Sequence, residues 1–344
     1  MSSEAPRPLF IHAMTLRPVA GCNDVRVHLP CRELALQPGV RVAIQESTAD
    51  LSLITPGEDA VFLWQRPILR DSHVEGLRRL IARGYVVVVE FDDHPGVWPD
   101  IAAHGHLNFR GVHAVQTSTE ALAALLRRFN PNVAVFPNAI DRLPPLRARA
   151  DATVTLFFGA LRRERDWAPI MPALNAVLQE CSDRVRVTVV HDRAFHDALA
   201  TANKTFHPTL SYGEYLEQLG TADINLLPLL DSEFRRMKSD LKFIESAAHG
   251  VVALASPTVY AGTLRHGETG MIFRTPKEFR NQLRGLISDS GRRKALAQAA
   301  WDYVRRERLL GDQTGPRLAW YRDLCARREQ LTRELGERVP ELRP

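Results

Sequence analysis

The chain has 344 residues, of which 45% are hydrophobic and 25% charged, a composition typical of a globular protein long enough for two domains. Its small basic excess, 45 Lys and Arg against 40 Asp and Glu, demands no nucleic acid partner. Its four cysteines show no zinc or disulfide spacing, and no apolar run approaches the ~20 residues of a membrane helix. Since the N-terminus has no signal-peptide pattern, we expect a cytoplasmic protein, for which peripheral attachment at the inner membrane is possible.

Short apolar runs rich in β-branched residues alternate with amphipathic segments along the first half. Between the runs, the segments Ser72–Arg83 and Thr119–Phe129 repeat their apolar residues at helical spacing. This alternation predicts an α/β fold with mainly parallel sheets. The predicted strands of this half are "DVRVHL", "VRVAI", "VFLW", "YVVVVEF", "AVQTS" and "VAVFPN".

A proline-rich, charged segment, "PNAIDRLPPLRARADA", separates two strands and is interpreted as a linker between domains. We therefore expect one domain over residues 1–147, a second over residues 148–312 and a helical tail over residues 313–344. In open α/β sheets, ligands bind beyond the carboxyl ends of the strands, so chemistry is expected in a cleft between the two domains. The predicted strands of the second domain are "VTLFFG", "VRVTVV", "INLLPL", "VVALAS" and "MIF".

Two lysines and a glutamate stand in "KSDLKFIESAAHGVVALASP" just before a buried strand. Ser239 is the predicted N-cap of a helix, whose first N–H groups form an anion site. Lys242 lies one turn into this helix and Glu245 follows it. A cation beside an anion site, with a carboxylate further in, suits the diphosphate and the ribose hydroxyls of a nucleotide. The alternative is a surface Lys–Glu pair of little energetic consequence.

Two glycine turns accompany this helix at the same predicted sheet edge. In "GALRRERDW", Gly159 ends a strand and is followed by Arg162, Arg163 and Arg165. The second turn is "HGETG", residues 266–270, which leads into a strand. The first of these turns, with its guanidinium groups, is a second candidate phosphate-binding element.

The ordered set "FFGALRRERD", "INLLPL", "KSDLKFIESAAHGVVALASP" and "LRHGETGMIF" resembles the C-terminal half of retaining GT-B glycosyltransferases of the group-1 (GT4-like) family. More loosely, "AVQTSTEALAALLRRFNPNVAVFPNAID" resembles the end of that family's acceptor domain. The resemblance covers roughly residues 85–310, and its specificity lies in the order of the motifs.

The resemblance implies a GT-B architecture, two Rossmann-like doubly wound domains facing across a cleft, with the tail crossing back to the first domain. It implies transfer of a sugar from a nucleotide-diphosphate sugar, UDP- or GDP-linked, to a glycan, lipopolysaccharide, lipid or protein hydroxyl. Configuration would be retained, no metal or other cofactor would be needed, and the setting would be bacterial polysaccharide biosynthesis. Glu245 would bind ribose and Lys242 the diphosphate. The other implied donor-binding residues are Gly159, Arg163, Arg165, Lys238 and Ser239, with further contacts from Asp240, Leu241 and His191.

Three departures from the family pattern concern the donor sugar and the loops around it. Many members carry a second glutamate eight residues before the ribose-binding one, where this chain has Met237. Glu233, Lys238 or Asp240 would then have to supply that contact. The family's arginine after the first glycine is Ala160, and the usual N-terminal glycine-rich loop is reduced to Gly21.

The strand in "VVVVEFDDHPGVWPD" ends in Asp92, Asp93 and His94, three titratable residues facing the expected cleft. They are the candidate catalytic residues, which would accept the proton of the acceptor hydroxyl or stabilise positive charge on the sugar. One alternative is a turn in which these side chains cap the backbone. A magnesium site is the other alternative, disfavoured because basic residues near Lys242 already neutralise a diphosphate.

Two other functions remain open from the sequence. Because Met237 stands where a sugar contact is expected, the chain could be a catalytically inactive nucleotide-sugar-binding or scaffold subunit of a glycosylation complex. A weaker alternative is a sugar-nucleotide epimerase on the same fold. Release of a nucleoside diphosphate would distinguish an active transferase from a scaffold.

Overall fold

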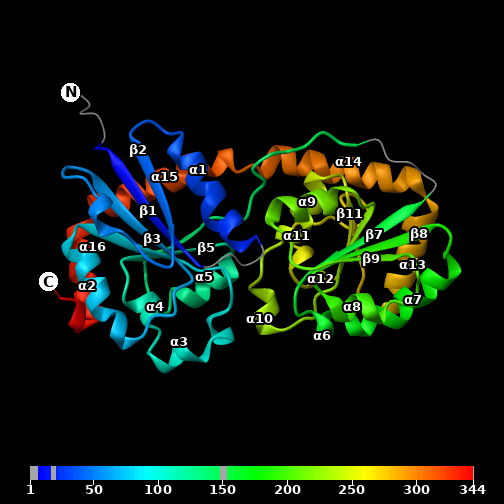
Figure 1. The fold of residues 1–344 in the computed structure, drawn as a ribbon, viewed down its shortest axis with the longest axis horizontal. Helices are drawn as coiled ribbons and strands as arrows, with labels where there is room; N and C mark the ends of the chain where they lie inside the picture. The colour runs from blue at the N-terminus through cyan, green and yellow to red at the C-terminus, as the bar shows by residue number, and fades with distance from the viewer. Residues whose placement is uncertain (1–6, 17–20, 148–152, 344) are drawn as a thin grey trace. The chain divides into compact units, whose positions relative to one another are not determined.

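The computed structural model describes residues 7–16, 21–147 and 153–343 (Figure 1). Two compact units make up the chain. Unit 1 consists of Met1–Asn138, Met237–Ser239 and Leu310–Pro344, and unit 2 of Ala139–Arg236 and Asp240–Leu309. The predicted linker therefore begins where unit 1 gives way to unit 2, and its residues 148–152, like the N-terminal residues 1–6, lie outside the described residues.

A parallel sheet forms the centre of unit 1, with six strands among its described residues. In the order β2-β1-β3-β4-β5-β6, β1 lies between β2 and β3, so the direction of winding reverses between β1 and β3. Such a reversal is the topological switch point at which α/β sheets bind ligands. The strands are β1 (Leu9–Thr15), β2 (Val40–Glu46), β3 (Asp59–Gln65), β4 (Tyr85–Glu90), β5 (Ala114–Thr117) and β6 (Val133–Val135).

Helices cover both faces of this sheet, which is why β4 is buried along its whole length. Leu9, Ile11 and Ala13 of β1 pack with α1 and α15 on one face, whereas Phe10 packs with α2, α4 and α5 on the other. The helices are η1, a π-helix (Asp24–His28), α1 (Leu29–Ala35), α2 (Val74–Ala82), α3 (Pro99–Ala103), α4 (Leu107–Arg110), α5 (Glu120–Leu126), α15 (Gly311–Ala326) and α16 (Arg328–Arg338), with 3-10 turns at Leu51–Leu53, Asp71–His73, Pro95–Val97 and Pro340–Leu342.

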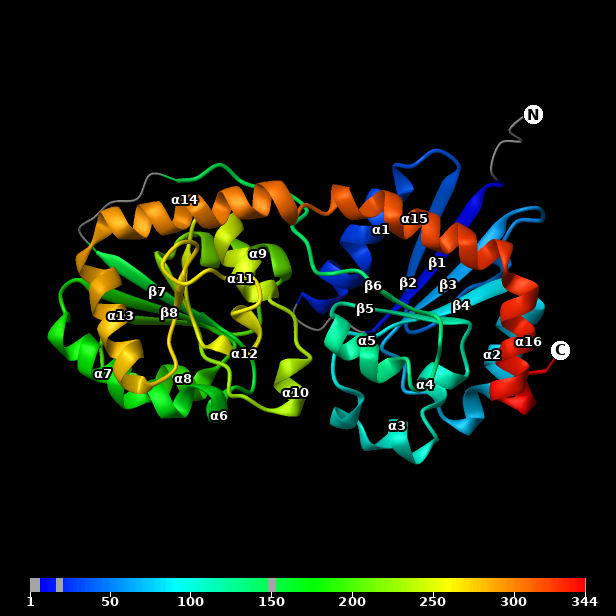
Figure 2. The ribbon, with the colours of Figure 1, turned by 180° about the vertical axis from the view of Figure 1, so that it is seen from behind.

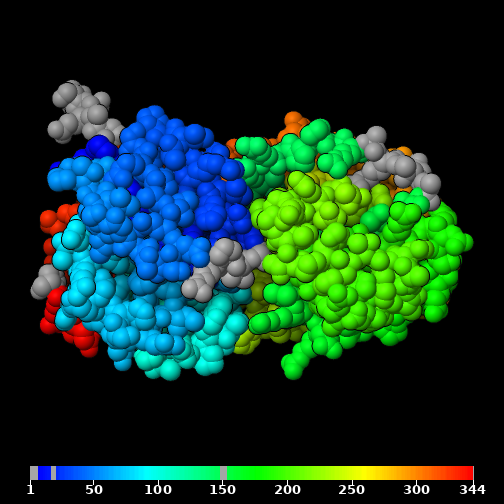
Figure 3. Space-filling view, in the orientation of Figure 1, coloured from blue at the N-terminus to red at the C-terminus, as the bar shows by residue number. Residues whose placement is uncertain are grey.

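The C-terminal tail is helical, as its apolar stripe predicts, and it packs within unit 1 (Figure 2). Tyr321 of α15 is fully buried and donates a hydrogen bond to Gln116 of β5 at 2.7 Å. Leu335 of α16 joins the core on the other face of the sheet. In space filling, the red atoms of α16 show only at the edge of unit 1 (Figure 3).

A second parallel sheet forms the centre of unit 2, again with six described strands. Its order, β12-β11-β10-β7-β8-β9, places the switch point between β7 and β10. The strands are β7 (Val154–Gly159), β8 (Val185–Val190), β9 (Lys204–His207), β10 (Ile224–Leu227), β11 (Val252–Ala255) and β12 (Met271–Ile272). The helices are α6 (Glu164–Trp167), α7 (Met171–Glu180), α8 (Arg193–Ala198), α9 (Tyr212–Gly220), α10 (Glu233–Arg236), α11 (Leu241–Ala248), α12 (Pro257–Tyr260), α13 (Pro276–Ser288) and α14 (Ser290–Glu307), with a 3-10 turn at Ala168–Ile170.

The sequence predictions match most of these elements, with one error of type and two omissions. "DVRVHL" is not a strand: Asp24–His28 is a π-helix that runs on into α1. In a half-buried strand, the side chain of Arg26 would face solvent. In the structure Arg26 is only 2% exposed, because it forms an ion pair with Glu90. The prediction also lacks β1, whose pattern is masked by burial on both faces, and β9, a short polar strand at the sheet edge.

Within the described ranges, no helix is long and apolar enough to cross a membrane.

Candidate functional site

Gly159 ends β7 at the switch point of unit 2, where only glycine fits. A Cβ atom at this position would lie 2.5 Å from the Phe157 ring and 2.6 Å from the Tyr215 ring. Contacts below 3.0 Å require a neighbour to move. The glycine therefore lets helix α9, which carries Tyr215, pack directly against the end of the strand.

Asp166 of α6 forms ion pairs with basic residues from both sides of the switch point. Its carboxylate accepts from Arg163, in the turn after β7, at 3.0 Å, and pairs with Arg235, in the segment after β10, at 3.1 Å. It also accepts from the backbone N–H of Leu230 at 3.1 Å. Because the Asp166 side chain is only 1% exposed, this carboxylate fixes both guanidinium groups at the carboxyl edge of the sheet.

Helix α11 begins one residue later than predicted. Its N-cap is Asp240, whose carboxylate forms a bidentate ion pair with Arg308 at 2.6 and 2.9 Å. Ser239 instead accepts a hydrogen bond from Asn138 at 2.7 Å and belongs to unit 1. The prediction of Ser239 as the N-cap is therefore wrong. The ion pair between Asp240 and Arg308 explains why the helix starts after Asp240.

Glu245 is a buried carboxylate on α11, with 1% of its side chain exposed. One oxygen, Oε1, accepts a hydrogen bond from the Tyr212 hydroxyl at 2.9 Å. The other, Oε2, has no hydrogen-bond partner in the described part of the chain, and Lys242 Nζ lies 3.9 Å away. Burial raises the pKa of Glu245, an effect that Lys242 and Tyr212 oppose. A buried carboxylate oxygen without a donor is costly for the free chain and is a natural acceptor for ligand hydroxyls.

Lys242 is held by an aromatic residue that the sequence analysis did not identify. Its ammonium group donates to the Tyr215 hydroxyl at 2.8 Å and lies 4.1 Å from the centre of that ring. Burial lowers the pKa of Lys242, and the neighbouring Glu245 raises it in part. The His191 ring lies parallel to the Tyr215 ring at 6.2 Å, on a backbone with a φ of 76°. Such a left-handed conformation is strained for histidine, and strain of this kind concentrates at functional sites.

Unit 2 thus brings together four of its predicted donor-binding residues, Gly159, Lys242, Glu245 and His191, around Tyr215 and Tyr212. Arg163 lies close enough to Lys242 to lower its pKa by charge repulsion. Three further predicted residues have other surroundings: Arg165 is exposed on α6, Asp240 pairs with Arg308, and Leu241, the first residue of α11, packs against the core. His266, in the predicted turn 266–270, accepts from the backbone of Ile272 at 2.9 Å and anchors β12.

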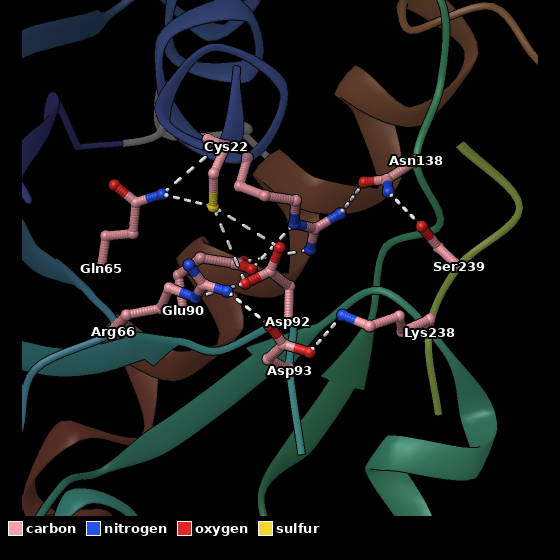
Figure 4. Close-up of polar contacts among 10 residues, drawn as sticks. Cys22, Gln65, Arg66, Glu90, Asp92, Asp93, Asn138, Lys238 and Ser239 are labelled. Atoms are coloured by element: carbon pink, nitrogen blue, oxygen red, sulfur yellow. Dashed lines mark hydrogen bonds and ion pairs between the residues drawn. The ribbon is translucent and has the colours of Figure 1, made fainter. Parts of the chain in front are cut away.

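The predicted catalytic aspartates lie in a charged cluster at the carboxyl end of β4 in unit 1 (Figure 4). Arg66 pairs with Asp92 at 2.8 Å and with Asp93 at 2.9 Å. Asp93 also accepts from Lys238 at 2.7 Å, and the Cys22 thiol lies 3.5 Å from Asp92. Lys238, predicted to bind the donor, is therefore part of unit 1 and neutralises Asp93.

A second, fully buried network lies behind this cluster. Arg26 donates to Glu90 at 2.8 and 3.1 Å and to Asn138 at 2.8 Å, and Gln116 donates to Glu90 at 2.7 Å. Asn138 in turn donates to Ser239, so the buried network reaches the segment that carries Lys238. Buried ionic groups are tolerated when each has such partners, and here they fix the strand end that carries Asp92.

His94 has a defined orientation that limits its chemistry. Its Nδ1 accepts a hydrogen bond from the backbone N–H of Gly96 at 2.9 Å, which caps the 3-10 turn Pro95–Val97. A neutral imidazole that accepts at Nδ1 carries its proton on Nε2. In the neutral form of His94, Nε2 therefore carries the N–H group and is a donor rather than an acceptor. The alternative in which these side chains cap the backbone is therefore correct for Nδ1 of His94. Any catalytic role of His94 would be as a hydrogen-bond donor through Nε2.

Met237 stands where many members of the resembling family carry a glutamate, and its apolar side chain supplies no polar group in that place. Its side chain packs against the core of unit 1, and its carbonyl accepts from the Thr119 hydroxyl at 3.0 Å. Across the described ranges, no group of three or more His, Cys, Asp and Glu side chains could hold a metal ion.

Sequence reasoning missed the aromatic and acidic residues that hold the predicted cations. Tyr215, Tyr212 and Asp166 carry no motif of their own, and only the fold brings them to the switch point. A signal existed for Arg66, since it stands two residues after the predicted strand "VFLW" and so at the same sheet edge as Asp92.

Solved structures share this fold. The Anabaena protein HepE, solved in complex with UDP and glucose, has a TM-score of 0.65 at 13% identity over 90% of this chain and 99% of its own. Sucrose-phosphate synthase from Thermosynechococcus elongatus gives 0.64 at 13% identity, covering 92% and 99%. WaaG, a glycosyltransferase involved in lipopolysaccharide biosynthesis, gives 0.61 at 13% identity, covering 90% and 98%. The chain therefore has the two-domain, Rossmann-like GT-B fold.

A family model matches part of the sequence. Residues 165–314, most of unit 2, match a family described as Glycosyl transferase-like. A comparison by sequence finds no significant match among curated proteins. The shared fold and the match of residues 165–314 support the prediction of a GT-B glycosyltransferase.

Proposed function

We propose that the chain transfers a sugar from a nucleotide-diphosphate sugar to an acceptor hydroxyl, with unit 2 binding the donor. The proposal is supported by the family match over residues 165–314 and by the residues at the switch point of unit 2. Because HepE was solved with UDP and with UDP-glucose, a UDP-linked donor is the first choice and a GDP-linked donor the second.

The unsatisfied oxygen of Glu245 carries the proposal. A carboxylate that is 1% exposed, with Oε2 lacking a hydrogen-bond donor, is expected where a bound ligand supplies the donor. Two adjacent ribose hydroxyls would do so, and hydrogen bonds to a charged acceptor are the stronger kind. Glu245 would thereby remain ionised in the complex.

Lys242 and Arg163 would hold the diphosphate. Lys242 is oriented by Tyr215, and Arg163 by the buried carboxylate of Asp166. Two cations oriented in advance on the same side of the sheet lose little side-chain entropy on binding a phosphate. They also supply positive charge in place of the family's arginine, which is Ala160 in this chain.

The finer features of the reaction are part of the proposal. Retention of configuration, activity without a metal ion and a glycan, lipopolysaccharide, lipid or protein acceptor rest on the family resemblance. Asp93 and His94 would act near the reacting hydroxyl, His94 as a hydrogen-bond donor. A cytoplasmic location, with or without attachment to the inner membrane, and a role in bacterial polysaccharide biosynthesis belong to the same proposal.

A binding or scaffold subunit without turnover is the second candidate. The observation that favours it is the position of Met237, which packs into the core of unit 1 rather than offering a polar group to a sugar. Such a subunit would bind a nucleotide sugar and release no nucleoside diphosphate.

Thermal unfolding with UDP, GDP, ADP, dTDP and CMP sugars tests donor binding. A ligand at a hundred times its dissociation constant adds about 2.7 kcal/mol to the free energy of unfolding, which gives a readable shift. We expect one nucleotide class to shift the transition of the parent chain and of the exposed control Glu217→Gln, and to lose its effect on Glu245→Gln. An equal shift in Glu245→Gln would refute the assignment of Glu245.

A further inference from the structure

A cavity of about 480 Å³ opens at the switch point of unit 1. Thr15, the last residue of β1, lines it together with Trp64 and Gln65, the last two residues of β3. Ser47, directly after β2, completes the polar part of the wall. Its volume lies within the range of about 300–1,000 Å³ common for small-molecule sites.

The described wall of the cavity contains no Asp, Glu, Lys or Arg and is largely apolar. Trp64, Met14 and Ile68 contribute hydrophobic surface, and Trp64 is held edge-on by Phe62 at 5.8 Å between ring centres. His73, also in the wall, accepts from the backbone N–H of Arg70 at 3.1 Å, which leaves its other ring nitrogen as the N–H donor of the neutral form. Among the described lining residues there is no lysine or arginine to bind a phosphate or carboxylate. The occupant should therefore be neutral, with one apolar face.

Gln65 supplies a buried polar atom in need of a partner. Its residue is 1% exposed, and its amide nitrogen donates to the Cys22 carbonyl at 3.3 Å. Because that carbonyl requires a donor, the amide oxygen must face the opposite way, as Figure 4 shows. Among the residues that the structure describes, this oxygen has no hydrogen-bond partner. A ligand hydroxyl at the cavity wall would satisfy it.

Backbone strain marks the same edge of the sheet. Ser47 and Arg66, which follow β2 and β3, have φ values of 65° and 44°, a conformation that few residues other than glycine adopt. The second of these strained residues is Arg66, which holds Asp92 and Asp93. Gln65 in the cavity wall and Arg66 in the candidate catalytic cluster are therefore neighbours in the chain.

We propose that this cavity binds a neutral pyranose ring, so that the acceptor is the neutral sugar end of a glycan or glycoside. A pyranose has an apolar C–H face that suits the Trp64 indole and hydroxyls at its rim that suit Gln65 and His73. Neither a lipid chain nor a sugar phosphate matches a wall whose described residues include no lysine or arginine and present amide and imidazole groups. The identification of this sugar as the acceptor rests on the proposed function.

Saturation-transfer NMR on the full chain tests the site. The probes are the methyl pyranosides of glucose, galactose, mannose and N-acetylglucosamine, with glucose 6-phosphate and monomeric octyl glucoside for comparison. Trp64→Leu removes the aromatic face but keeps an apolar side chain, and Trp64→Phe keeps a smaller aromatic face. Trp301→Leu, in unit 2, is the matched control, because Trp301 is also half-buried and lines no part of this cavity. UDP binding is measured on every variant.

At least one neutral glycoside should bind the parent chain and Trp301→Leu equally, with affinity falling at least about tenfold in Trp64→Leu, equivalent to about 1.4 kcal/mol, and less in Trp64→Phe. Absence of binding by all four glycosides, or unchanged binding in Trp64→Leu, would overturn the proposal. So would Trp64-dependent binding of glucose 6-phosphate or octyl glucoside in preference to the methyl glycosides. If UDP fails to bind the parent chain while the glycosides bind through Trp64, the donor function fails and the sugar site stands.

Discussion

At the scale of single residues, the proposed donor site combines the buried carboxylate of Glu245 with the partly exposed ammonium group of Lys242. Among the described residues, one oxygen of Glu245 has no donor, and Lys242 donates its nearest hydrogen bond to Tyr215. An unpaired buried acceptor costs about 1–3 kcal/mol. Sites built to bind polar ligands commonly carry such a cost, because the ligand removes it on binding.

This cost should appear in the pH dependence of stability. Burial raises the pKa of Glu245 above the usual 4.5, so between the two values the folded chain binds more protons than the unfolded chain. The contribution of Glu245 to the free energy of unfolding therefore falls as pH rises through this window. Glu245→Gln does not titrate, and its stability relative to the parent should increase from acidic to neutral pH.

Urea unfolding of both chains over a series of pH values measures this difference. Glu217→Gln, an exposed substitution of the same type in unit 2, is measured over the same series as the control. A Glu245→Gln difference that is constant, or that decreases towards neutral pH, would show that the folded state stabilises the Glu245 carboxylate and would contradict the account.

The sequence could identify Lys242 and Glu245 because they stand in a helix before a buried strand, next to a family-like motif. It could not identify Tyr215 or Asp166, whose roles depend on distances between elements far apart in the chain. For Lys238 the motif was misleading: it stands four residues before Lys242, yet its partner in the structure is Asp93.

At the scale of elements, the end of strand β7 and helix α9 are joined by a close approach at Gly159. The added methyl group of Gly159→Ala would overlap the Phe157 and Tyr215 rings. Overpacking of this kind costs about 1–3 kcal/mol. Because Tyr215 holds Lys242, the variant should also bind the nucleotide more weakly.

Gly213→Ala provides the matched control, because nothing lies within 4 Å of a Cβ at this position on the same helix. Removing a glycine there should leave nucleotide affinity unchanged and stabilise the chain by up to about 1 kcal/mol. Urea unfolding and a nucleotide titration of both variants measure these effects. Equal stability and equal affinity in the two variants would exclude the close packing described for Gly159.

Helices and strands could be predicted from the sequence where buried residues recur at a regular spacing. They could not be predicted where a charged residue is buried. In Asp24–His28, valines alternate with polar residues as in a strand, yet Val25, Arg26 and Val27 are all buried. The buried ion pair of Arg26 with Glu90, distant in sequence, allows a π-helix in that place. Local patterns do not report such a pair.

At the scale of the whole molecule, the alternation of strands and helices predicted two parallel sheets, and two parallel sheets are found. The path of the chain was harder to predict. Unit 1 recruits Met237–Ser239 from the middle of the second half through Thr119, Asn138 and Asp93. These polar contacts join segments about a hundred residues or more apart and leave no periodic signal in the sequence.

The most direct test of the central claim is release of UDP from UDP-glucose by the full chain, followed over time with the methyl glycosides as acceptors. The account predicts release above the rate in buffer, retained in Glu217→Gln and lost in Glu245→Gln. Failure of the parent chain to release a nucleoside diphosphate from any sugar nucleotide that it binds would contradict a transferase and favour a scaffold subunit.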